Sequence, residues 1–339
     1  MTAADVRRIP APETRILTRR DVQALLGFGE CIAAVEAAFR LHAEGRSLAP
    51  GVLGVPSRAG GFHIKAAGLE MNRLYFAAKT NANFSGNPRR HGLPAIQGVI
   101  VLCDGDDGRP LAVMDSIEVT IRRTAAATAV AARRLARPDA KVVTICGCGN
   151  QGRAQLRALA RVLPLQRAYA FDADEAAARA YARDLSAELS LDVRPVTDHV
   201  EAARGSDVCV TCTPSRQPFL FRDHVKVGTF VAAVGADSPD KRELDPALVA
   251  ASVLVVDVLE QCASIGELHH ALDAGVVTRR SVHAELADLI TGRKPGRRSA
   301  EEITVFDSTG TALEDVAAAA VVYEKAVASG AGLTVALGN

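Results

Sequence analysis

The chain lacks an excess of charge of either sign, because 40 lysines and arginines oppose 39 acidic residues. The resulting net charge of +1 gives no electrostatic footprint for nucleic acid or an anionic membrane. The sequence also lacks an apolar run of the roughly 18–20 residues that span a bilayer. Its first 13 residues lack the apolar stretch of a secretory signal. We therefore expect a cytoplasmic protein that binds neither nucleic acid nor membrane.

Lysine is scarce, and cysteine occurs in an odd number. Seven cysteines in a chain of 339 residues favour a reducing compartment over a disulfide framework. Cys209 and Cys212 have the spacing of a metal-binding pair, but an odd separation along a strand places them on opposite faces, so we expect core thiols and no metal site. Only seven of the 40 basic residues are lysines. A lysine here can mark a place that needs a compact ammonium, which singles out Lys65, Lys79 and Lys241.

Hydrophobic patterning divides the chain into two parts. The length of 339 residues also predicts about two domains, at roughly 150 residues per domain. A short strand at 13–18 and two helices, the first capped by Thr18, precede strand-like runs between 51 and 113. These runs predict a mainly antiparallel sheet. An alanine-rich helix is expected over 116–135. Beyond it, near-continuous apolar strands alternate with helices, which is typical of a parallel sheet covered on both faces.

The glycine-rich turn at 147–152 follows a buried-looking strand and opens a helix, the context that a dinucleotide-binding motif requires. Gly147 allows the tight turn, Gly149 lets the backbone approach a pyrophosphate, and Gly152 permits close packing of helix on strand. The helix N-terminus supplies free N–H groups and a positive dipole. Asp172 ends the next strand, 20 residues after Gly152, and completes the motif. A glycine turn without a ligand is the alternative.

Asp172 also indicates which cofactor binds. A carboxylate at this position accepts hydrogen bonds from ribose hydroxyls and repels a 2′-phosphate. No basic residue follows Asp172 in the turn to receive such a phosphate. We therefore expect NAD(H) rather than NADP(H).

Motifs spread over nearly the whole chain resemble, in the right order, the ornithine cyclodeaminase/mu-crystallin family. They are Lys79, GLP (92–94), Gln97-Gly98, MDS (114–116), Arg123-Thr124-Ala125-Ala126, LARPDA (135–140), AVGADSPDKRELD (233–245) and VFDSTG (305–310). The family comprises cyclodeaminases, cyclic ketimine reductases and amino-acid dehydrogenases. The resemblance implies an α/β fold, with a doubly wound Rossmann domain (126–313) inserted in an α+β domain (1–125 plus 314–339). That second domain would bind substrate and form a homodimer through its sheet.

The resemblance places Lys79 and Arg123 on the substrate carboxylate and makes Asp237 the catalytic residue. An arginine fork and a lysine point charge together suit a carboxylate. The alternatives are an internal salt bridge for Arg123 and a solvated edge-strand position for Lys79. Asp237 follows a predicted parallel strand and would shuttle protons if burial raised its pKa. Its alternative role is a loop aspartate that caps the next turn.

Further positions match cofactor contacts of the family. They are Thr124, Asn150, Gln151, Thr213, Val234, Lys241, Ser308 and Thr309, together with Gly147, Gly149, Gly152 and Asp172 of the dinucleotide motif.

The chain departs from the family pattern ahead of the first sheet. Many members carry Pro-Pro-Arg where this chain has Ala49-Pro50-Gly51, and the following run is His63-Ile64-Lys65-Ala66. Strand alternation places His63 and Lys65 on one face. We expect Lys65 to replace the missing arginine as a contact for the substrate carboxylate or side chain, with a solvated lysine as the alternative.

Three functions are compatible with these residues. The first is an NAD-dependent cyclodeaminase or amino-acid dehydrogenase that acts at the α-carbon of an L-amino acid through an imine. The second is a reductase of cyclic ketimines such as pyrroline-2-carboxylate. The presence of Asp237 disfavours this function, because mammalian crystallin-like reductases of the family lack that carboxylate. The third is a non-enzymatic crystallin-like nucleotide-binding protein, which the retention of Lys79, Arg123 and Asp237 disfavours. The substrate side chain stays open at this point.

Overall fold

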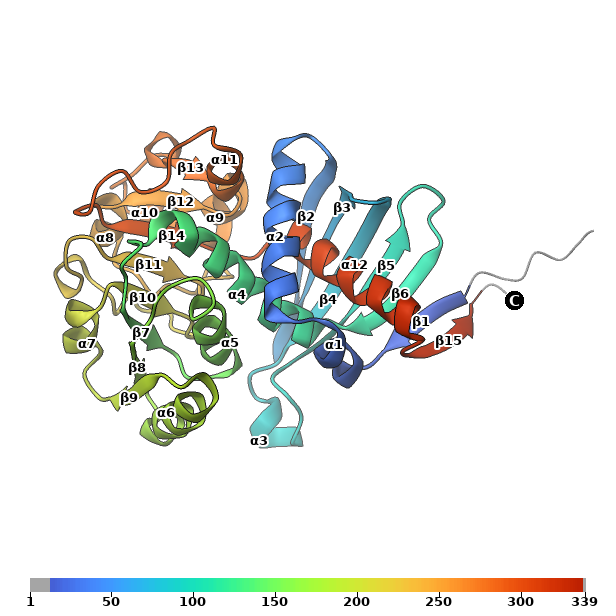
Figure 1. Cartoon of the computed structure of the whole chain (residues 1–339), viewed down its shortest axis with the longest axis horizontal. Coiled ribbons are helices and arrows are strands. Elements are labelled where there is room, and N and C mark those ends of the chain that lie inside the picture. Colours follow the sequence, from blue (N-terminus) through green and yellow to red (C-terminus); the bar gives the residue numbers. More distant parts are fainter. Residues whose placement is uncertain (1–12, 338–339) are drawn as a thin grey trace, which may run out of the picture.

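A computed structural model describes residues 13–337, in which two sheets lie side by side and one long helix connects them (Figure 1). The first twelve residues, on which the expectation about a secretory signal rests, lie outside the described residues. Within the described range, no single helix is long and apolar enough to cross a membrane. The helices α1 (Arg19–Leu25) and α2 (Phe28–Ala43) pass that test only as a pair bent by 85°.

The first sheet has seven strands in the order β15-β1-β6-β5-β4-β3-β2. All neighbouring strands are antiparallel except β1 and β6, which confirms the expected mainly antiparallel sheet. The bounds are β1 Glu13–Leu17, β2 Ser47–Ser57, β3 Gly60–Glu70, β4 Leu74–Asn83, β5 Ile96–Asp104, β6 Pro110–Asp115 and β15 Leu333–Ala336.

The second sheet has eight strands in the order β13-β12-β14-β11-β10-β7-β8-β9, and every pair is parallel. From β7 the chain continues outward through β8 and β9, and it then returns to place β10 on the other side of β7. This reversal is a topological switch point, where doubly wound sheets bind ligands. The bounds are β7 Val142–Cys146, β8 Arg167–Phe171, β9 Asp192–Val196, β10 Val208–Thr211, β11 Phe230–Ala233, β12 Val253–Val256, β13 Ala284–Glu285 and β14 Thr304–Asp307.

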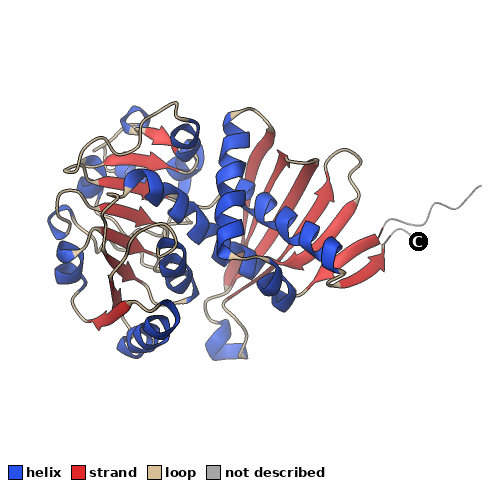
Figure 2. Ribbon diagram, viewed as in Figure 1, coloured by secondary structure: helices blue, strands red, loops and turns tan. Residues whose placement is uncertain are grey.

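Helices cover both faces of the parallel sheet (Figure 2). Val208 and Val210 of β10 belong to one buried cluster, and Cys209 between them belongs to another. Cys212 packs against the first cluster, which confirms that the two cysteines point to opposite faces. The remaining helices are α3 Asn87–His91, α4 Ser116–Leu135, α5 Asn150–Leu159, α6 Glu175–Leu189, α7 His199–Gly205, α8 Pro246–Ala250, α9 Leu259–Ile265, α10 Glu267–Asp273, α11 Leu286–Thr291 and α12 Ala312–Ser329, with 3-10 turns at Arg222–His224 and Arg279–Ser281.

The antiparallel sheet is covered on one face only. The helix α12 packs on β3 and β4 and against α2 and α4, and Figures 1 and 2 show α2 and α12 in front of this sheet. Strand alternation turns Lys65, Ala67 and Leu69 of β3 toward the helices, where all three are buried. The residues between them face away from the helices, and no element in the described range covers that face.

Local sequence explains the helix boundaries that were expected. Thr18 caps α1 through a capping box with Asp21, as predicted. Asp115 caps α4 by accepting from the N–H groups of Ile117 and Glu118, and the helix spans the expected 116–135. The expected domain boundaries at 125/126 and 313/314 fall inside α4 and α12. The division of the chain at these points stays a prediction.

Candidate active site

The glycine turn between β7 and α5 has the geometry that its sequence predicts. Gly147 has φ +108°, a left-handed value that favours glycine. A Cβ on Gly152 would lie 1.9 Å from the carbonyl oxygen of Gly147, so only glycine allows this approach, and nothing lies within 4 Å of a Cβ on Gly149. Gly149 is the N-cap of α5 and offers no side-chain cap. The first N–H groups of α5 can therefore receive an anionic ligand.

Asp172 lies beside this turn, because β8 is the parallel neighbour of β7. One carboxylate oxygen accepts from the N–H of Cys148 at 2.8 Å and the other from the N–H of Asp174 at 3.0 Å. Each oxygen keeps a free lone pair for a ribose hydroxyl. The turn and Asp172 are thus held together as one dinucleotide-binding unit.

A cavity of about 300 Å³ lies between the carboxyl ends of the parallel strands and the antiparallel sheet. Its lining joins residues from β3, β4 and α4 to residues from α5 and the loops after β10, β11 and β14. The expected site residues in this lining are Lys65, Lys79, Arg123, Thr124, Gln151, Thr213, Val234, Asp237, Lys241, Ser308 and Thr309. The others, Gly147, Gly149, Asn150, Gly152 and Asp172, form the neighbouring turn.

Lys79 and Arg123 take part in a buried ion-pair network with two carboxylates of α12. The Lys79 Nζ lies 2.7 Å from Asp315, and Arg123 contacts Asp315 at 3.0 Å and Glu314 at 2.9 Å. Burial lowers the pKa of Lys79 to about 7, although the Asp315 carboxylate opposes this shift. Burial also opposes the charge on Arg123, but Asp315 and Glu314 raise its pKa above the ordinary value. Lys79 is therefore no solvated edge residue, whereas Arg123 both forms an internal salt bridge and lines the cavity.

Lys65 is a buried cation beside this network. It stands directly opposite Lys79 across β3 and β4, and the residue is only 7% exposed. Its Nζ donates to the backbone carbonyls of Thr309 at 3.0 Å and Gly310 at 2.7 Å. Burial and the Arg123 charge lower its pKa. Within residues 13–337 no carboxylate forms an ion pair with Lys65, so the cavity holds one lysine charge that only neutral groups contact.

Asp237 differs from its expectation in one respect. Its side chain is 52% exposed and pairs with Lys241 at 2.6 Å. Desolvation acts to raise the pKa of Asp237, but Lys241, Lys65 and His63 together hold that pKa below its ordinary value. The condition that burial raises this pKa is therefore not met, because the nearby cations outweigh desolvation. The side chain caps no turn among the described residues, and it points its charge at the lysines of the cavity.

Two buried polar atoms in the lining lack a hydrogen-bond partner: the amide nitrogen of Gln151 and the hydroxyl of Ser308. Burying such groups is costly unless a ligand satisfies them. Gln151 lies in the first turn of α5 and Ser308 directly follows β14, both at the carboxyl edge of the parallel sheet, so the residues present suit a dinucleotide whose nicotinamide end enters this space. Glu243 shapes the same region by accepting from the N–H groups of Thr213 and Gly235.

The sequence reasoning missed some residues of the cavity wall and both carboxylates behind it. Glu314 and Asp315 lie in the first turn of α12 and are followed by seven apolar residues, 316–322, and two buried charges in such surroundings require cationic partners. That pattern could have identified them. The missed lining residues are Asn81, Asn83, Ile96, Thr120 and Pro214. His63 was assigned only to a strand face and Cys212 only to the core.

Comparison with known proteins decides the family. A sequence profile of the ornithine cyclodeaminase/mu-crystallin family matches residues 12–330. The chain belongs to this family. It is 41% identical to an alanine dehydrogenase of Archaeoglobus fulgidus over 94% of this chain and 97% of that protein.

Solved structures agree with this assignment. An archaeal alanine dehydrogenase dimer with bound NAD superposes with a TM-score of 0.91 at 39% identity, covering 96% of this chain and 99% of that chain. The Δ1-pyrroline-2-carboxylate reductase of Thermococcus litoralis, in complex with NADH and L-proline, also gives 0.91, at 33% identity over 95% of this chain and 100% of that one. These matches confirm the α/β Rossmann fold, the NAD(H) cofactor and an NAD-dependent enzyme of amino or imino acids.

Proposed function

We propose that the chain is an NAD-dependent oxidoreductase that interconverts a small α-amino acid with its imino and keto acid, working as a homodimer. The observation that carries this proposal is that Lys65, Lys79, Arg123 and Asp237 line one cavity together with Gln151 and Ser308, whose buried polar atoms have no partner within the described residues. A volume of about 300 Å³, shared between a nicotinamide and a substrate, suits a small substrate.

The charges of the cavity support a carboxylate substrate. Lys79 and Arg123 are balanced by Glu314 and Asp315, and Lys241 is balanced by Asp237. Lys65 alone among these cations has no carboxylate partner within the described residues, and burying a cation without an anion is energetically costly. One substrate carboxylate neutralises it, with Lys65 as the principal contact and Lys79 and Arg123 as neighbours on the same wall. A bound carboxylate also favours the charged form of Lys79, whose pKa burial lowers to about 7.

The residues around the reacting carbon then have distinct tasks. NAD, when bound, supplies the acceptor or donor of a hydride. The three cations fix the acid end of the substrate and so limit which substrate atom can face the nicotinamide. Asp237 is ionised at neutral pH, so it can accept a proton from the water that attacks the imine carbon, and its negative charge stabilises a cationic imine.

A dehydrogenase accords with the site better than a cyclodeaminase or a ketimine reductase. The terminal ammonium of a diamino acid needs a carboxylate of its own, and in the described lining the sole carboxylate is Asp237, which already pairs with Lys241. Hydrolysis of an imine needs water beside the base. The half-exposed side chain of Asp237 provides that access.

A substrate panel tests the proposal. Purified protein with NADH is offered pyruvate, glyoxylate or oxaloacetate plus ammonium, and pyrroline-2-carboxylate, while NADH absorbance is followed; L-alanine and L-ornithine with NAD+ test the reverse direction. We expect turnover with a small keto acid only when ammonium is present. Turnover of pyrroline-2-carboxylate alone would instead identify a ketimine reductase, and cyclisation of L-ornithine a cyclodeaminase.

The uncovered face of the antiparallel sheet supports the proposed homodimer. Register places Leu48, Leu53, Val55, Phe62 and Val99 on the face away from the helices. Each of these residues is 39–57% exposed. An exposed apolar patch of this kind marks a protein interface.

A further inference from the structure

One segment of the chain holds all three cations of the proposed substrate site. The segment 308–315 joins the end of β14 to the first turn of α12. Two of its backbone carbonyls accept from Lys65, and its two carboxylates pair with Lys79 and Arg123. Ser308, the first residue of the segment, lines the cavity together with these cations. The position of this segment therefore determines how the cations face a substrate.

Asp315 bridges two of these cations. One of its carboxylate oxygens lies 3.0 Å from Nε of Arg123, and the other lies 2.7 Å from Nζ of Lys79. Glu314 pairs with Arg123 at 2.9 Å, and within the described residues it forms no ion pair with Lys79. The second oxygen of Glu314 accepts from the N–H of Thr311, the N-cap of α12. Of the two carboxylates, only Asp315 therefore connects Lys79 with Arg123, whereas Glu314 also completes the helix cap.

Both carboxylates contact the cations without occupying the cavity. Lys79 and Arg123 line the cavity, but neither carboxylate does, and both acidic side chains are at most 2% exposed. Arg123 donates from Nε to Asp315 and from Nη1 to Glu314. Because a guanidinium has five N–H groups, these two bonds leave three, including both on Nη2, for a ligand. The network thus holds the guanidinium and still leaves donors for a substrate carboxylate.

The backbone of the segment also fits closely against Arg123. Gly310 has φ +72°, a left-handed value that favours glycine. A Cβ on Gly310 would clash with the guanidinium of Arg123. The N–H of Gly310 donates to the buried carboxylate of Asp257 at 2.7 Å. Glycine at this position therefore lets the segment that carries Asp315 pass directly beside Arg123.

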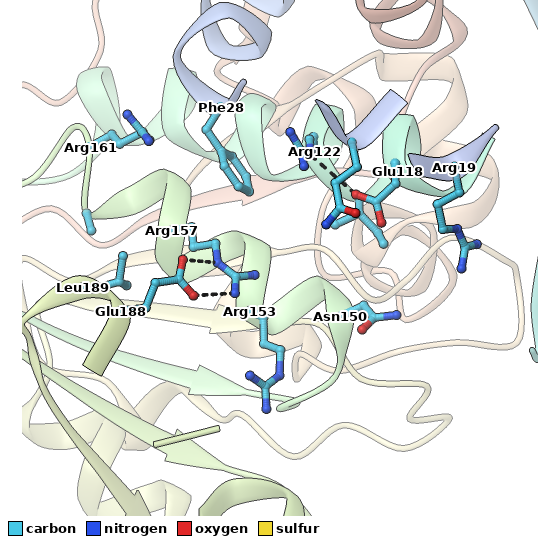
Figure 3. Close-up of a pocket in the computed structure, with 13 residues that line it drawn as sticks. Arg19, Phe28, Glu118, Arg122, Asn150, Arg153, Arg157, Arg161, Glu188 and Leu189 are labelled. Atoms are coloured by element: carbon cyan, nitrogen blue, oxygen red, sulfur yellow. Dashed lines mark hydrogen bonds and ion pairs between the residues drawn. The ribbon is translucent and has the colours of Figure 1, made fainter. Parts of the chain in front are cut away.

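The arginine next to Arg123 on α4 has a different environment. Arg122 lines a separate cleft of about 820 Å³, outside the proposed active site (Figure 3). Its partner, Glu118, lies one turn earlier on the same helix, at 3.5 Å. The pair of Arg122 and Glu118 therefore stays within α4. The carboxylates that hold Arg123 come instead from α12, 191 and 192 residues later in the chain.

We propose that Asp315 is a positioning residue, which holds Lys79 and Arg123 together as one clamp for the substrate carboxylate. This inference rests on the proposed function, since the clamp acts on the substrate of that reaction. A buried ion pair contributes little net stability, because the cost of desolvation offsets the attraction. Fixed donors, however, place the acid end of the substrate and hence its α-carbon, and a misplacement of about 1 Å can lower a rate about 100-fold.

Asp315 also acts on the charge of Lys79. Burial lowers the pKa of Lys79 to about 7, and the charges of Arg123 and Lys65 act in the same direction. The Asp315 carboxylate opposes these effects. In Asp315→Asn the pKa of Lys79 should therefore fall further, so the lysine loses its positive charge at a lower pH. Because a substrate carboxylate binds the charged form, its affinity should begin to fall at a correspondingly lower pH.

Titration calorimetry with pyruvate, over a range of pH, tests the proposal. The protein is saturated with NAD+, which cannot pass a hydride to pyruvate, so binding is measured without turnover. The test variants are Asp315→Asn and Asp315→Glu. Glu314→Gln removes the adjacent buried charge, which pairs with Arg123 only. Glu118→Gln is the matched control in the separate cleft, and NADH titration and thermal unfolding show whether each variant is folded.

In the wild-type protein, the affinity for pyruvate should fall above about pH 7, where Lys79 loses its proton. The fall should begin at lower pH in Asp315→Asn, and at the wild-type pH in Glu314→Gln and Glu118→Gln. A fall at the wild-type pH in Asp315→Asn, or the same shift in Glu314→Gln, would overturn the proposal. The absence of saturable pyruvate binding by the wild-type protein would overturn it as well.

Asp315→Glu separates the position of the clamp from its charge, and it decides the proposal if Asp315→Asn fails to fold. The variant keeps the carboxylate but lengthens the side chain by one methylene. Pyruvate should bind about tenfold more weakly at every pH, and kcat with the keto acid and ammonium that give turnover should drop by about the same factor. Wild-type affinity and kcat would contradict a positioning role. If the wild-type protein turns over no acid of the panel, the proposed function fails, but pyruvate binding still decides whether Asp315 positions the clamp.

Discussion

At the scale of single residues, the charge of Lys65 is the feature on which substrate binding depends. Within the described residues, no carboxylate forms an ion pair with the buried Lys65, and the variant Lys65→Gln removes its charge, so the substrate KM should rise and kcat/KM should fall about 10- to 100-fold. NADH affinity should stay the same. Lys294→Gln is the matched control, because that lysine is exposed and does not line the cavity. Steady-state kinetics check this, and an unchanged KM in Lys65→Gln would show that the lysine is structural.

Asp237 and Lys241 provide a prediction about pH. The lowered pKa of Asp237 means that the carboxylate stays ionised until the pH falls below its ordinary range, so the acidic limb of kcat/KM should lie at low pH. Lys241→Gln removes the positive charge that contributes most to the lowering of the Asp237 pKa, so the acidic limb should move to higher pH. Asp237→Asn should abolish the limb and lower kcat by about 10²–10⁴-fold. An acidic limb at the same pH in Lys241→Gln would refute the assignment to Asp237.

Individual site residues could be predicted from the sequence where they belong to a motif with a specific chemical role. Lys79, Arg123 and Asp237 were found from motifs, and the structure brings all three to one cavity. The direction of the Asp237 pKa shift could not be predicted, because it depends on whether Lys241 pairs with Asp237 and on how close Lys65 and His63 lie after folding. Likewise the partners of Arg123, on α12, are 191 and 192 residues away in the chain.

At the scale of elements, the turn between β7 and α5 makes a sharp prediction. Gly152→Ala places a Cβ 1.9 Å from the Gly147 carbonyl oxygen, so the turn must shift and NADH binding should be lost. Gly205→Ala is the control, because nothing lies within 4 Å of a Cβ there. NADH fluorescence titration and thermal unfolding measure the two effects. Normal NADH binding by Gly152→Ala would disprove the role of this turn.

Helices and strands could be predicted from the sequence where the local hydrophobic pattern and the packing in the folded protein favour the same structure. The helix over 116–135 has its cap, its alanines and its buried faces all in the sequence, and α4 matches it. The strand β2 begins at Ser47, before the expected start of the sheet near 51, and its register with β3 shifts between Leu48 and Gly51, a stretch that contains Pro50. Pairing with β3, rather than propensity, holds this segment in the sheet. The short β13 and β15 depend on their neighbours in the same way.

At the scale of the whole molecule, the apolar sheet face predicts the assembly. Leu53→Glu places a charge on that face and should convert the proposed dimer to a monomer. Val227→Glu is the control, since Val227 is 58% exposed and Leu53 57% exposed, but Val227 lies on the parallel-sheet side. Sedimentation velocity distinguishes the two states. A dimer that survives Leu53→Glu unchanged would place the interface elsewhere.

The central claim is that this molecule moves a hydride to the α-carbon of a small imino acid, and isotope transfer tests it most directly. NADH labelled with deuterium on the transferring face at C4 is supplied with the keto acid and ammonium that give turnover. The amino-acid product is then examined by mass spectrometry and proton NMR. We predict one deuterium, bonded to Cα, and none elsewhere. An amino acid without deuterium at Cα, or the absence of any product with every acid of the panel, would contradict the account.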